Sequence, residues 1–363
     1  MQRNIIYYGL LNKTKKMKRI LPFLIIACQS MAVLAQDDDN KTPYLTKSLA
    51  QDAISRVVVS TSAGGINVSG ASGQAARIEV YIKGNNGKEL TKEEIQKRLD
   101  EDYDLSIEVN NHELSATVKN KHEFSNWKRQ MSISFKIYVP QAVTTNLKTS
   151  GGGISLEYLK GSETFSTSGG GLDIDHLSGT IHGRTSGGGI NVSNSSEDID
   201  LSTSGGGIEA KNCSGKIKLI TSGGGLELHN LKGEIYAHTS GGGVDGDNIE
   251  GELKTGTSGG SIDLKRMNCS LDANTSGGNL YAQMTQVGNY LKLNASAGDI
   301  DLELPAKQGL DLNLRGESVS QHPTNMNAFS GDLAKNHING SVNGGGIPVE
   351  AQASSGDIHL KFN

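Results

Sequence analysis

Proline and aromatic residues are scarce in this chain of 363 residues. It contains six prolines against 47 glycines, and Phe, Trp and Tyr together make up 5% of it. Collagen needs far more proline and a glycine at every third position, so that architecture is excluded. The low aromatic content argues against one large globular core, whereas 35% hydrophobic residues are too many for a disordered chain. The composition fits a fold that buries a thin, regular core of Ile, Leu and Val.

Cysteine is also rare, and one of the three cysteines lies in an N-terminal segment unlike the rest of the chain. Four closely spaced basic residues precede an apolar stretch that is too short and too interrupted to span a membrane. This pattern predicts a secretory signal peptide over residues 1–35, cleaved after Ala35, with Met17 as an alternative start. The residues before Cys28 resemble a lipoprotein cleavage box, so a lipid anchor at Cys28 is an alternative. An uncleaved anchor is a third.

Basic residues are in deficit once the predicted signal peptide is removed. That segment carries six of the 35 Lys and Arg residues and none of the 39 Asp and Glu residues, so the mature chain has 29 basic residues and a net charge of −10. An acidic surface argues against binding nucleic acid or anionic lipid by charge. It is compatible with solubility or with weak binding of divalent cations.

A tandem repeat dominates the central part of the chain. The tetrapeptide Thr-Ser-Gly-Gly recurs at intervals of 18 residues without insertion or deletion, which predicts a repeat architecture. Its eight copies begin at Thr149, Thr167, Thr185, Thr203, Thr221, Thr239, Thr257 and Thr275. Degenerate copies occur at residues 61–65, 295–298 and 353–356.

Apolar residues recur at fixed positions of each repeat and alternate with polar ones. The sixth, eighth, eleventh and fifteenth positions are mostly Ile, Leu, Val or Met, with Glu163 as an exception at the fifteenth. Period-two alternation is typical of strands with one buried face. One repeat cannot bury that face, but stacked repeats bury it against the same positions above and below, about 4.8 Å away. The sequence therefore predicts an all-β fold, a single-stranded β-solenoid (β-helix) with 18-residue rungs.

Each glycine triplet is expected to form a structural corner of the coil. Glycine has no side chain to clash with the next rung, and the Thr and Ser beside it are expected to form hydroxyl ladders along the stack. A phosphate-binding loop would need a following helix or a lysine, and neither is present. Rung spacing separates Cys213 from Cys269 by roughly 14 Å, which is beyond the reach of a disulfide. We therefore expect two free thiols, with Cys213 in a Leu position.

The flanks differ from the repeats. Alternating segments predict strands, including a hairpin about Asn110, and Thr91 with Glu94 forms a capping box before a helix. We expect that helix to lie as a lid over the open end of the solenoid. The chain divides into a signal peptide (1–35), a linker (36–50), N-terminal strands with a capping helix (51–148, helix 91–102), regular repeats (149–294) and degenerate rungs that close the stack around a loop (295–363, loop 315–337).

These motifs resemble a known bacterial family. The stretches Thr-Ser-Ala-Gly-Gly-Ile-Asn-Val, Tyr-Val-Pro, Leu-Glu-Leu-Pro and Ser-Gly-Asp-Ile, together with the serial rungs, are similar to the "putative-adhesin" domain family of exported β-strand-repeat proteins; they lie at residues 61–68, 138–140, 302–305 and 355–358. The resemblance covers roughly residues 50–363. It implies a single-stranded β-helix, export to the periplasm or cell surface, and no established chemistry. It implies no functional residue, because the matching positions are turns and strands.

The seventh position of the repeats carries the clearest cluster of charge. An outward column with neighbours about 5 Å apart is expected from Asp173, Asn191, Glu209, Glu227, Asp245 and Asp263. The simplest interpretation is a solvated face, cross-paired with the ninth position. A calcium-binding column is an alternative, because oxygen ligands suit Ca²⁺. A pair of glycosidase carboxylates is a weaker one, because every rung looks alike.

Histidines and aromatic residues give weaker signals. The histidines of the repeats share no column and no metal-ligand spacing, so we interpret them as surface residues: His176, His182, His229 and His238. Four aromatic residues are candidates for stacking on sugars, although ordinary strand aromatics are the simpler interpretation: Phe124, Trp127, Tyr158 and Tyr236.

The sequence as a whole predicts an exported, non-enzymatic β-solenoid scaffold. We expect adhesin-like binding of a glycan or a protein at the cell surface or in the periplasm, without catalytic residues, without nucleic acid, and without a cofactor other than the calcium alternative. Membrane contact is expected only through a lipid anchor at Cys28. A structural role in envelope assembly without a ligand is the alternative, and a carbohydrate-active β-helix enzyme is a weaker one. The expected location is periplasmic, outer-membrane associated or extracellular.

Overall fold

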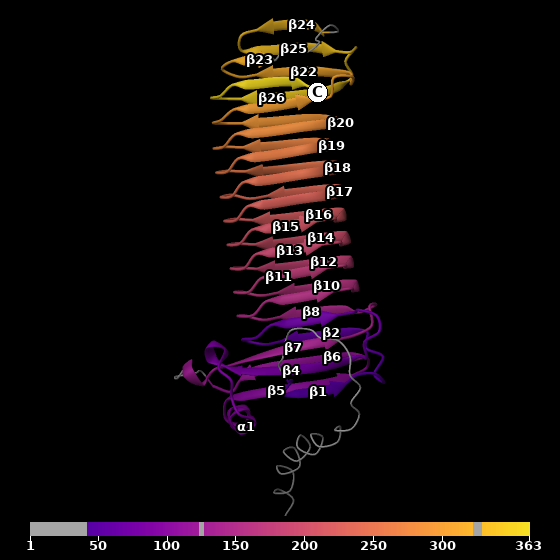
Figure 1. Ribbon diagram of the computed structural model, residues 1–363, viewed down its shortest axis with the longest axis vertical. Helices are drawn as coiled ribbons and strands as arrows, with labels where there is room; N and C mark the ends of the chain where they lie inside the picture. The colour runs from indigo at the N-terminus through magenta and orange to yellow at the C-terminus, as the bar shows by residue number, and fades with distance from the viewer. Residues whose placement is uncertain (1–41, 123–126, 322–328) are drawn as a thin grey trace, which may run out of the picture. The chain divides into compact units, whose positions relative to one another are not determined.

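The regular repeats form a coil of parallel strands in the computed structural model, which describes residues 42–122, 127–321 and 329–363. The strands of this region are β8 (Thr144–Lys148), β9 (Ile154–Glu157), β10 (Lys160–Ser166), β11 (Leu172–Asp175), β12 (Ser178–Thr185), β13 (Ile190–Ser193), β14 (Ser196–Thr203), β15 (Ile208–Lys211), β16 (Ser214–Thr221), β17 (Leu226–His238), β18 (Val244–Thr257), β19 (Ile262–Thr275) and β20 (Leu280–Ala295). Each rung contributes to two faces, either as two separate strands or, from β17 to β20, as one long strand that continues from one face to the other. The strands lie across the long axis of the stack (Figure 1). The predicted signal peptide with its cleavage after Ala35, the alternative start Met17 and the anchor candidate Cys28 lie outside the described residues.

Apolar side chains stack in register at a spacing of one repeat. Ile154 lies beside Leu172, Leu172 lies beside Ile190, and the column continues to Leu280. These side chains are buried and belong to one continuous hydrophobic core. Burial of each Ile or Leu contributes about 1.5–3 kcal/mol, so the same favourable contact is repeated along the coil. The predicted β-solenoid with 18-residue rungs is confirmed.

Distant segments form the rung that precedes the regular repeats. Strand β2 (Arg56–Ser60) pairs with β8, and β3 (Ile66–Ser69) pairs with β9. The degenerate motif at residues 61–65 therefore stacks directly on the first regular motif, which begins at Thr149. The chain between these two rungs leaves the coil and builds a cap.

The cap consists of antiparallel strands that extend both faces. Its strands are β1 (Leu45–Ser48), β4 (Arg77–Gly84), β5 (Tyr103–Asn110), β6 (Glu113–Asn120) and β7 (Met131–Tyr138). The β5–β6 hairpin turns at Asn111 and His112, which both have positive φ, as a tight hairpin turn requires. Strand β1 pairs with β4. The linker predicted over residues 36–50 is therefore wrong at residues 45–48.

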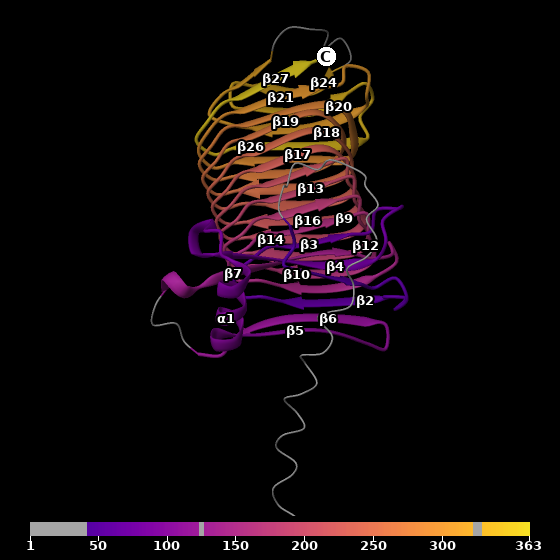
Figure 2. The ribbon, with the colours of Figure 1, turned by 60° about the horizontal axis from the view of Figure 1, so that its bottom comes forward.

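Helix α1 (Lys92–Asp102) packs against β5 beside the strands of the cap (Figure 2). Its buried residue is Ile95. The outermost strands of the two faces at this end are β1 and β5. Strands and helix together close the stack, which corrects the expectation of a helical lid. No helix within residues 42–122, 127–321 or 329–363 has the length and hydrophobicity needed to cross a membrane.

The first turn of α1 is capped by Thr91 as the sequence predicts, but only one of the two hydrogen bonds of the predicted capping box is formed. The Thr91 hydroxyl accepts the backbone N–H of Glu94 at 3.2 Å. The Glu94 carboxylate pairs with Arg98 one turn further along instead of bonding the backbone at the N-cap. One of the unpaired N–H groups at the helix start is thereby satisfied.

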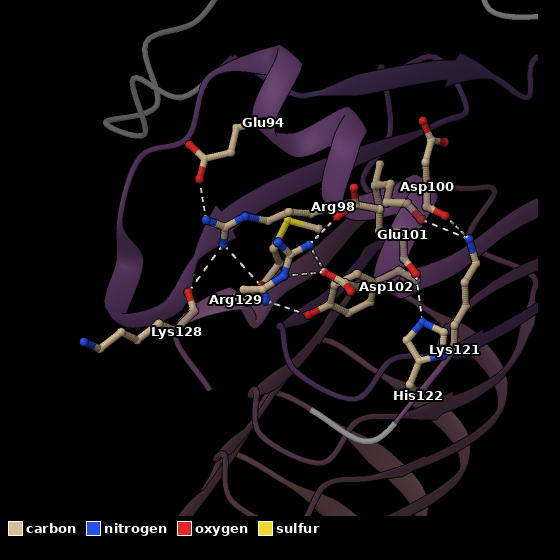
Figure 3. A network of polar contacts seen from close by, with 12 residues as sticks. Glu94, Arg98, Asp100, Glu101, Asp102, Lys121, His122, Lys128 and Arg129 are labelled. Carbon is tan, nitrogen blue, oxygen red and sulfur yellow. Dashed lines mark hydrogen bonds and ion pairs between the residues drawn. The ribbon is translucent and has the colours of Figure 1, made fainter. Parts of the chain in front are cut away.

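The last turn of α1 is fixed by basic side chains from neighbouring connections (Figure 3). Lys121 donates to the carbonyl of Asp100 at 2.6 Å, which satisfies one of the free carbonyls at the helix end. Arg129, in the short 3₁₀ helix η2 (Trp127–Arg129), forms ion pairs of 2.7 Å with Glu101 and Asp102. A second 3₁₀ helix, η1 (Asn85–Gly87), follows β4.

The C-terminal strands insert into the stack instead of following one another. They are β21 (Ile300–Leu304), β22 (Leu310–Arg315), β23 (Val319–Gln321), β24 (Phe329–Ala334), β25 (His337–Val342), β26 (Ile347–Ala353) and β27 (Ile358–Phe362). Strand β26 lies between β20 and β22, and β27 lies between β21 and β23. The degenerate motif at residues 353–356 therefore stacks on the one at residues 295–298. Strand β25 then pairs antiparallel with β22, and β24 pairs antiparallel with β25, so both extend one face.

Part of the loop predicted over residues 315–337 is strand. It contains β23 and β24, and residues 322–328 lie outside the described part of the chain. Apolar and polar residues do not alternate regularly in β23 and β24, and few of their side chains are buried. A search for hydrophobic periodicity therefore does not detect these strands.

The fourth residue of each repeat has no room for a side chain. A Cβ added to Gly188 would lie 2.1 Å from the carbonyl oxygen of Gly170 in the preceding rung. The fifth residue differs, because a Cβ on Gly189 would meet its nearest atom at an ordinary contact distance of 3.4 Å. Neither glycine has a positive φ, so close approach alone separates the two positions.

We expect Gly188→Ala to destabilise the coil much more than Gly189→Ala. The clash at Gly188 is with backbone, which cannot move without separating the rungs, so a loss of about 3 kcal/mol is expected, against less than about 1 kcal/mol for Gly189→Ala. Chemical denaturation followed by circular dichroism measures both. Equal losses for the two variants would show that the close approach does not limit the stack.

Candidate functional site

The acidic side chains of the seventh position lie in one column. Asp173, Asn191, Glu209, Glu227, Asp245 and Asp263 face one another in register on successive strands from β11 to β19. Each lies one strand away from the next, so adjacent carboxylates repel unless other groups compensate them.

Neighbouring polar groups compensate part of this column. Asn191 donates to Asp173 at 2.8 Å, and Lys265 forms an ion pair of 2.8 Å with Asp263. The hydrogen bond to Asp263 holds the pKa of Lys265 above its usual value, and Lys211 is held in the same way. In the described part of the chain, no three His, Cys, Asp or Glu side chains are placed to share a metal ion. The column is therefore cross-paired in part, by Lys211 with Glu209 and by Lys265 with Asp263.

The hydroxyl of each motif threonine bonds to two backbone groups. Thr203 donates to the carbonyl of Gly188 in the preceding rung at 2.7 Å and accepts the N–H of Gly206 in its own rung at 3.4 Å. All eight motif threonines make both contacts. The expected ladder of hydroxyls bonded to one another is wrong for these threonines, because their hydroxyls are used by the backbone of the corner.

A ladder of asparagines occupies the tenth position, which the apolar pattern does not predict. Amide side chains donate from rung to rung at 3.1, 3.0 and 2.8 Å along Asn194, Asn212, Asn230 and Asn248. Their φ values of 50–55° suit asparagine, which tolerates the left-handed region. The recurrence of Asn every 18 residues is the sequence signal for this ladder. Its role is to hold a second corner of the coil.

The two cysteines of the repeats are buried free thiols, as predicted. Cys213 lies in the column that Leu231 continues in the next rung, and both side chains belong to the core. Burial raises the pKa of Cys213 to about 11 and that of Cys269 to about 12. Both thiols are therefore packing residues and not nucleophiles.

A shallow groove runs along the stack beside the Thr-Ser corners. It has a volume of about 440 Å³, and it is lined by the last residue and the first two residues of successive rungs, from Lys148 to Ser222. The motif serines along it are exposed and make no side-chain hydrogen bond to a described residue: Ser168, Ser186, Ser204 and Ser222. Free hydroxyls in a row can donate to or accept from a bound polar molecule.

Two cationic side chains lie in this groove without an ion pair to any described residue. They are Lys148 and Arg184, both exposed. Ser166 occupies the register position between them, so their Cα atoms are two rungs apart, about 9.6 Å. The nearby Lys218 is instead paired with Asp200 at 3.3 Å. The residues that line the groove include no Asp, Glu or His.

Aromatic and histidine side chains are distributed over different elements. His176 stacks on Tyr158, with ring centroids 4.7 Å apart, and His238 stacks on Tyr236 at 6.5 Å. Trp127, 56% exposed, lies in η2 of the cap. Phe124 lies outside the described residues. The described aromatics that were candidates for sugar stacking therefore form no shared platform.

One carboxyl group lies inside the core. Glu163 of β10 is fully buried in the column that Ile181 and Ile199 continue in the next rungs. Its Oε2 accepts the hydroxyl of Thr145 at 2.5 Å, whereas Oε1 has no hydrogen-bond partner among the described residues. Burial disfavours the ionised form and raises the pKa of Glu163 to about 7.

The part of the chain that forms the coil and most of its cap matches the model of a known protein family. The Toastrack DUF4097 family model matches residues 54–361, so the chain belongs to this family. The match begins just before β2 and reaches into the last strand, β27. The resemblance inferred from the sequence motifs is confirmed. No curated protein matches the chain.

Two solved structures align with most of the chain. A "putative cell adhesion protein" from Clostridium sporogenes covers 88% of this chain and 98% of its own, with 12% identity and a TM-score of 0.19. A "putative adhesin" from Bacteroides fragilis covers 88% of this chain and 96% of its own, with 12% identity and a TM-score of 0.22. These values are too low for either likeness to assign a function to this chain.

We expect Glu163 to make stability fall as pH rises. The pKa of the folded chain, about 7, lies above the ordinary value of 4.5, so between these values the native state binds more protons than the unfolded state. The contribution of Glu163 to the free energy of unfolding is therefore greatest below pH 4.5. It decreases by about 3 kcal/mol between pH 4.5 and pH 7. Glu163→Gln should remove this decrease.

The denaturation midpoint at pH 5 and pH 8 measures this effect. Glu227→Gln, which removes a carboxylate at an exposed position of the same coil, is the matched control and should keep the wild-type pH dependence. An unchanged pH dependence in Glu163→Gln would contradict the assignment of the buried carboxyl as its source.

Proposed function

We propose that this protein is an exported, non-enzymatic β-solenoid scaffold that binds a ligand, in the manner of an adhesin, at the cell surface or in the periplasm. One observation carries this proposal. The groove beside the Thr-Ser corners is open to solvent, and its lining includes serine hydroxyls and two cationic groups that no described residue engages. Polar groups that the fold itself does not use are the groups that a ligand can recognise.

The chemistry of the groove supports binding over cleavage. Glycoside hydrolysis normally uses two carboxyl groups on either side of the bond that breaks. The residues lining the groove include no carboxylate and no histidine, so they supply no ordinary general acid or base. The acidic column of the seventh position lies on strands of the other face.

Export is supported by the basic and apolar pattern of residues 1–35 and by the acidic mature chain. We expect the mature protein, isolated from the envelope or culture medium of its native host, to begin at Gln36 and to partition into the aqueous phase of a detergent extraction. Intact-mass spectrometry measures the first residue. A diacylated chain beginning at Cys28, found in the detergent phase, would replace this proposal with a tethered lipoprotein.

We expect the purified mature chain to bind at least one member of a panel of acidic glycans, neutral glycans and extracellular matrix proteins, without cleaving it. Surface plasmon resonance measures binding, and a reducing-end assay measures cleavage. Release of reducing ends would overturn the non-enzymatic assignment. Absence of binding to the whole panel would favour the alternative, a structural role in envelope assembly without a ligand.

A further inference from the structure

We propose that the groove beside the Thr-Ser corners binds an anionic polysaccharide, extended along the stack, with Lys148 and Arg184 neutralising its acidic groups. This inference rests on the proposed function and names the class of ligand. It is carried by charge complementarity and by the geometry of one surface.

Charge complementarity makes the ligand acidic. Many lysines of the coil form ion pairs with neighbouring acidic side chains, such as Lys218 with Asp200 at 3.3 Å and Lys265 with Asp263 at 2.8 Å. Lys148 and Arg184 share a groove whose lining residues include no acid. Two exposed, unpaired cations without a local counter-ion attract an anion, in a mature chain that is otherwise acidic.

The Cα spacing of the two cationic residues is similar to the repeat of a polymer with one acidic group in each disaccharide. Lys148 and Arg184 lie on either side of Ser166 in the register of β8, β10 and β12, two rungs or about 9.6 Å apart. An extended chain of pyranose units places alternate residues at a similar separation. The planar guanidinium of Arg184 can bind a carboxylate or sulfate through two parallel hydrogen bonds.

Hydroxyl groups line the path between and beyond the cations. Ser168, Ser186 and Ser204 lie one rung apart along the groove and have hydroxyls that no described residue uses. The motif threonines beside them are already bonded to backbone, so the serines are the groups left to bind a sugar. A repeating ligand can use each of them in the same way, which suits a polysaccharide.

Other polymers fit the groove less well. A peptide that adds a strand needs a free sheet edge, whereas the strands beside the groove are paired on both sides within the stack. A single-stranded nucleic acid needs aromatic side chains for base stacking, and no aromatic residue lines the groove. Its apolar lining is limited to Ile220, at the far end.

The test is isothermal titration of the mature chain with three hexasaccharides: hexagalacturonate, which is carboxylated, a sulfated heparin fragment, and neutral maltohexaose. We expect at least one acidic probe to bind about tenfold or more tightly than maltohexaose, and about 0.5 M NaCl to weaken it strongly. The two acidic probes distinguish carboxylate from sulfate recognition. Equal binding of all three would overturn the proposal.

A pair of double variants locates the site. Lys148→Gln with Arg184→Gln should weaken binding of the acidic probe about tenfold or more, because two charge-assisted contacts are lost. Lys160→Gln with Lys216→Gln removes the same net charge outside the groove and should change binding less than about twofold. Circular dichroism confirms that both fold, as expected for exposed side chains.

The outcomes separate this inference from the proposed function. If the groove variant binds the acidic probe as tightly as wild type, the groove is not the site, although the protein remains a binding scaffold. If no acidic probe binds while another member of the ligand panel does, the ligand class is wrong and the proposed function stands. If nothing in either set binds, both fail.

Discussion

Close backbone contact at the glycine corner is the constraint on which the rest of this structure depends. The fourth residue of each rung lies so near the carbonyl of the preceding rung that a Cβ at Gly188 would come within 2.1 Å of it. The same carbonyls accept the hydroxyls of the motif threonines, so one corner holds both the closest approach and a repeated hydrogen bond. The regular rungs that meet in this way are of equal length, and equal length keeps the Ile and Leu columns in register.

A coil that repeats its backbone also repeats its surface. Each outward position becomes a column, as the seventh position shows with its acids and the tenth with its asparagine ladder. A column of identical side chains suits a ligand with a repeating structure. Each contact contributes little binding free energy, so the total depends on how many rungs the ligand contacts. The groove from Lys148 to Ser222 has this character, and its two cations give it the selectivity that hydroxyls alone lack.

Departures from the repeat mark where this chain does something particular. Glu163 replaces an apolar residue in its column and brings a titratable group into the core, next to Thr145 of β8. The two extra residues of β20 are accommodated between Val287 and Leu291, just before the C-terminal strands insert. At both ends the chain changes to antiparallel strands, which cover the parallel rungs and leave edges unlike those of the coil.

The sequence by itself determined the rung length, the buried positions, the capped helix and the free thiols Cys213 and Cys269, because each follows from a short-range period or from counting rungs. It could not place β26 between β20 and β22, since that order is set by which distant strands bury each other, and no local pattern records it. The groove was hidden for the same reason. Lys148 and Arg184 belong to different rungs, and only stacking brings them, with the serines, onto one surface. Periodicity is a local property of the chain, whereas a binding surface is a property of the packing.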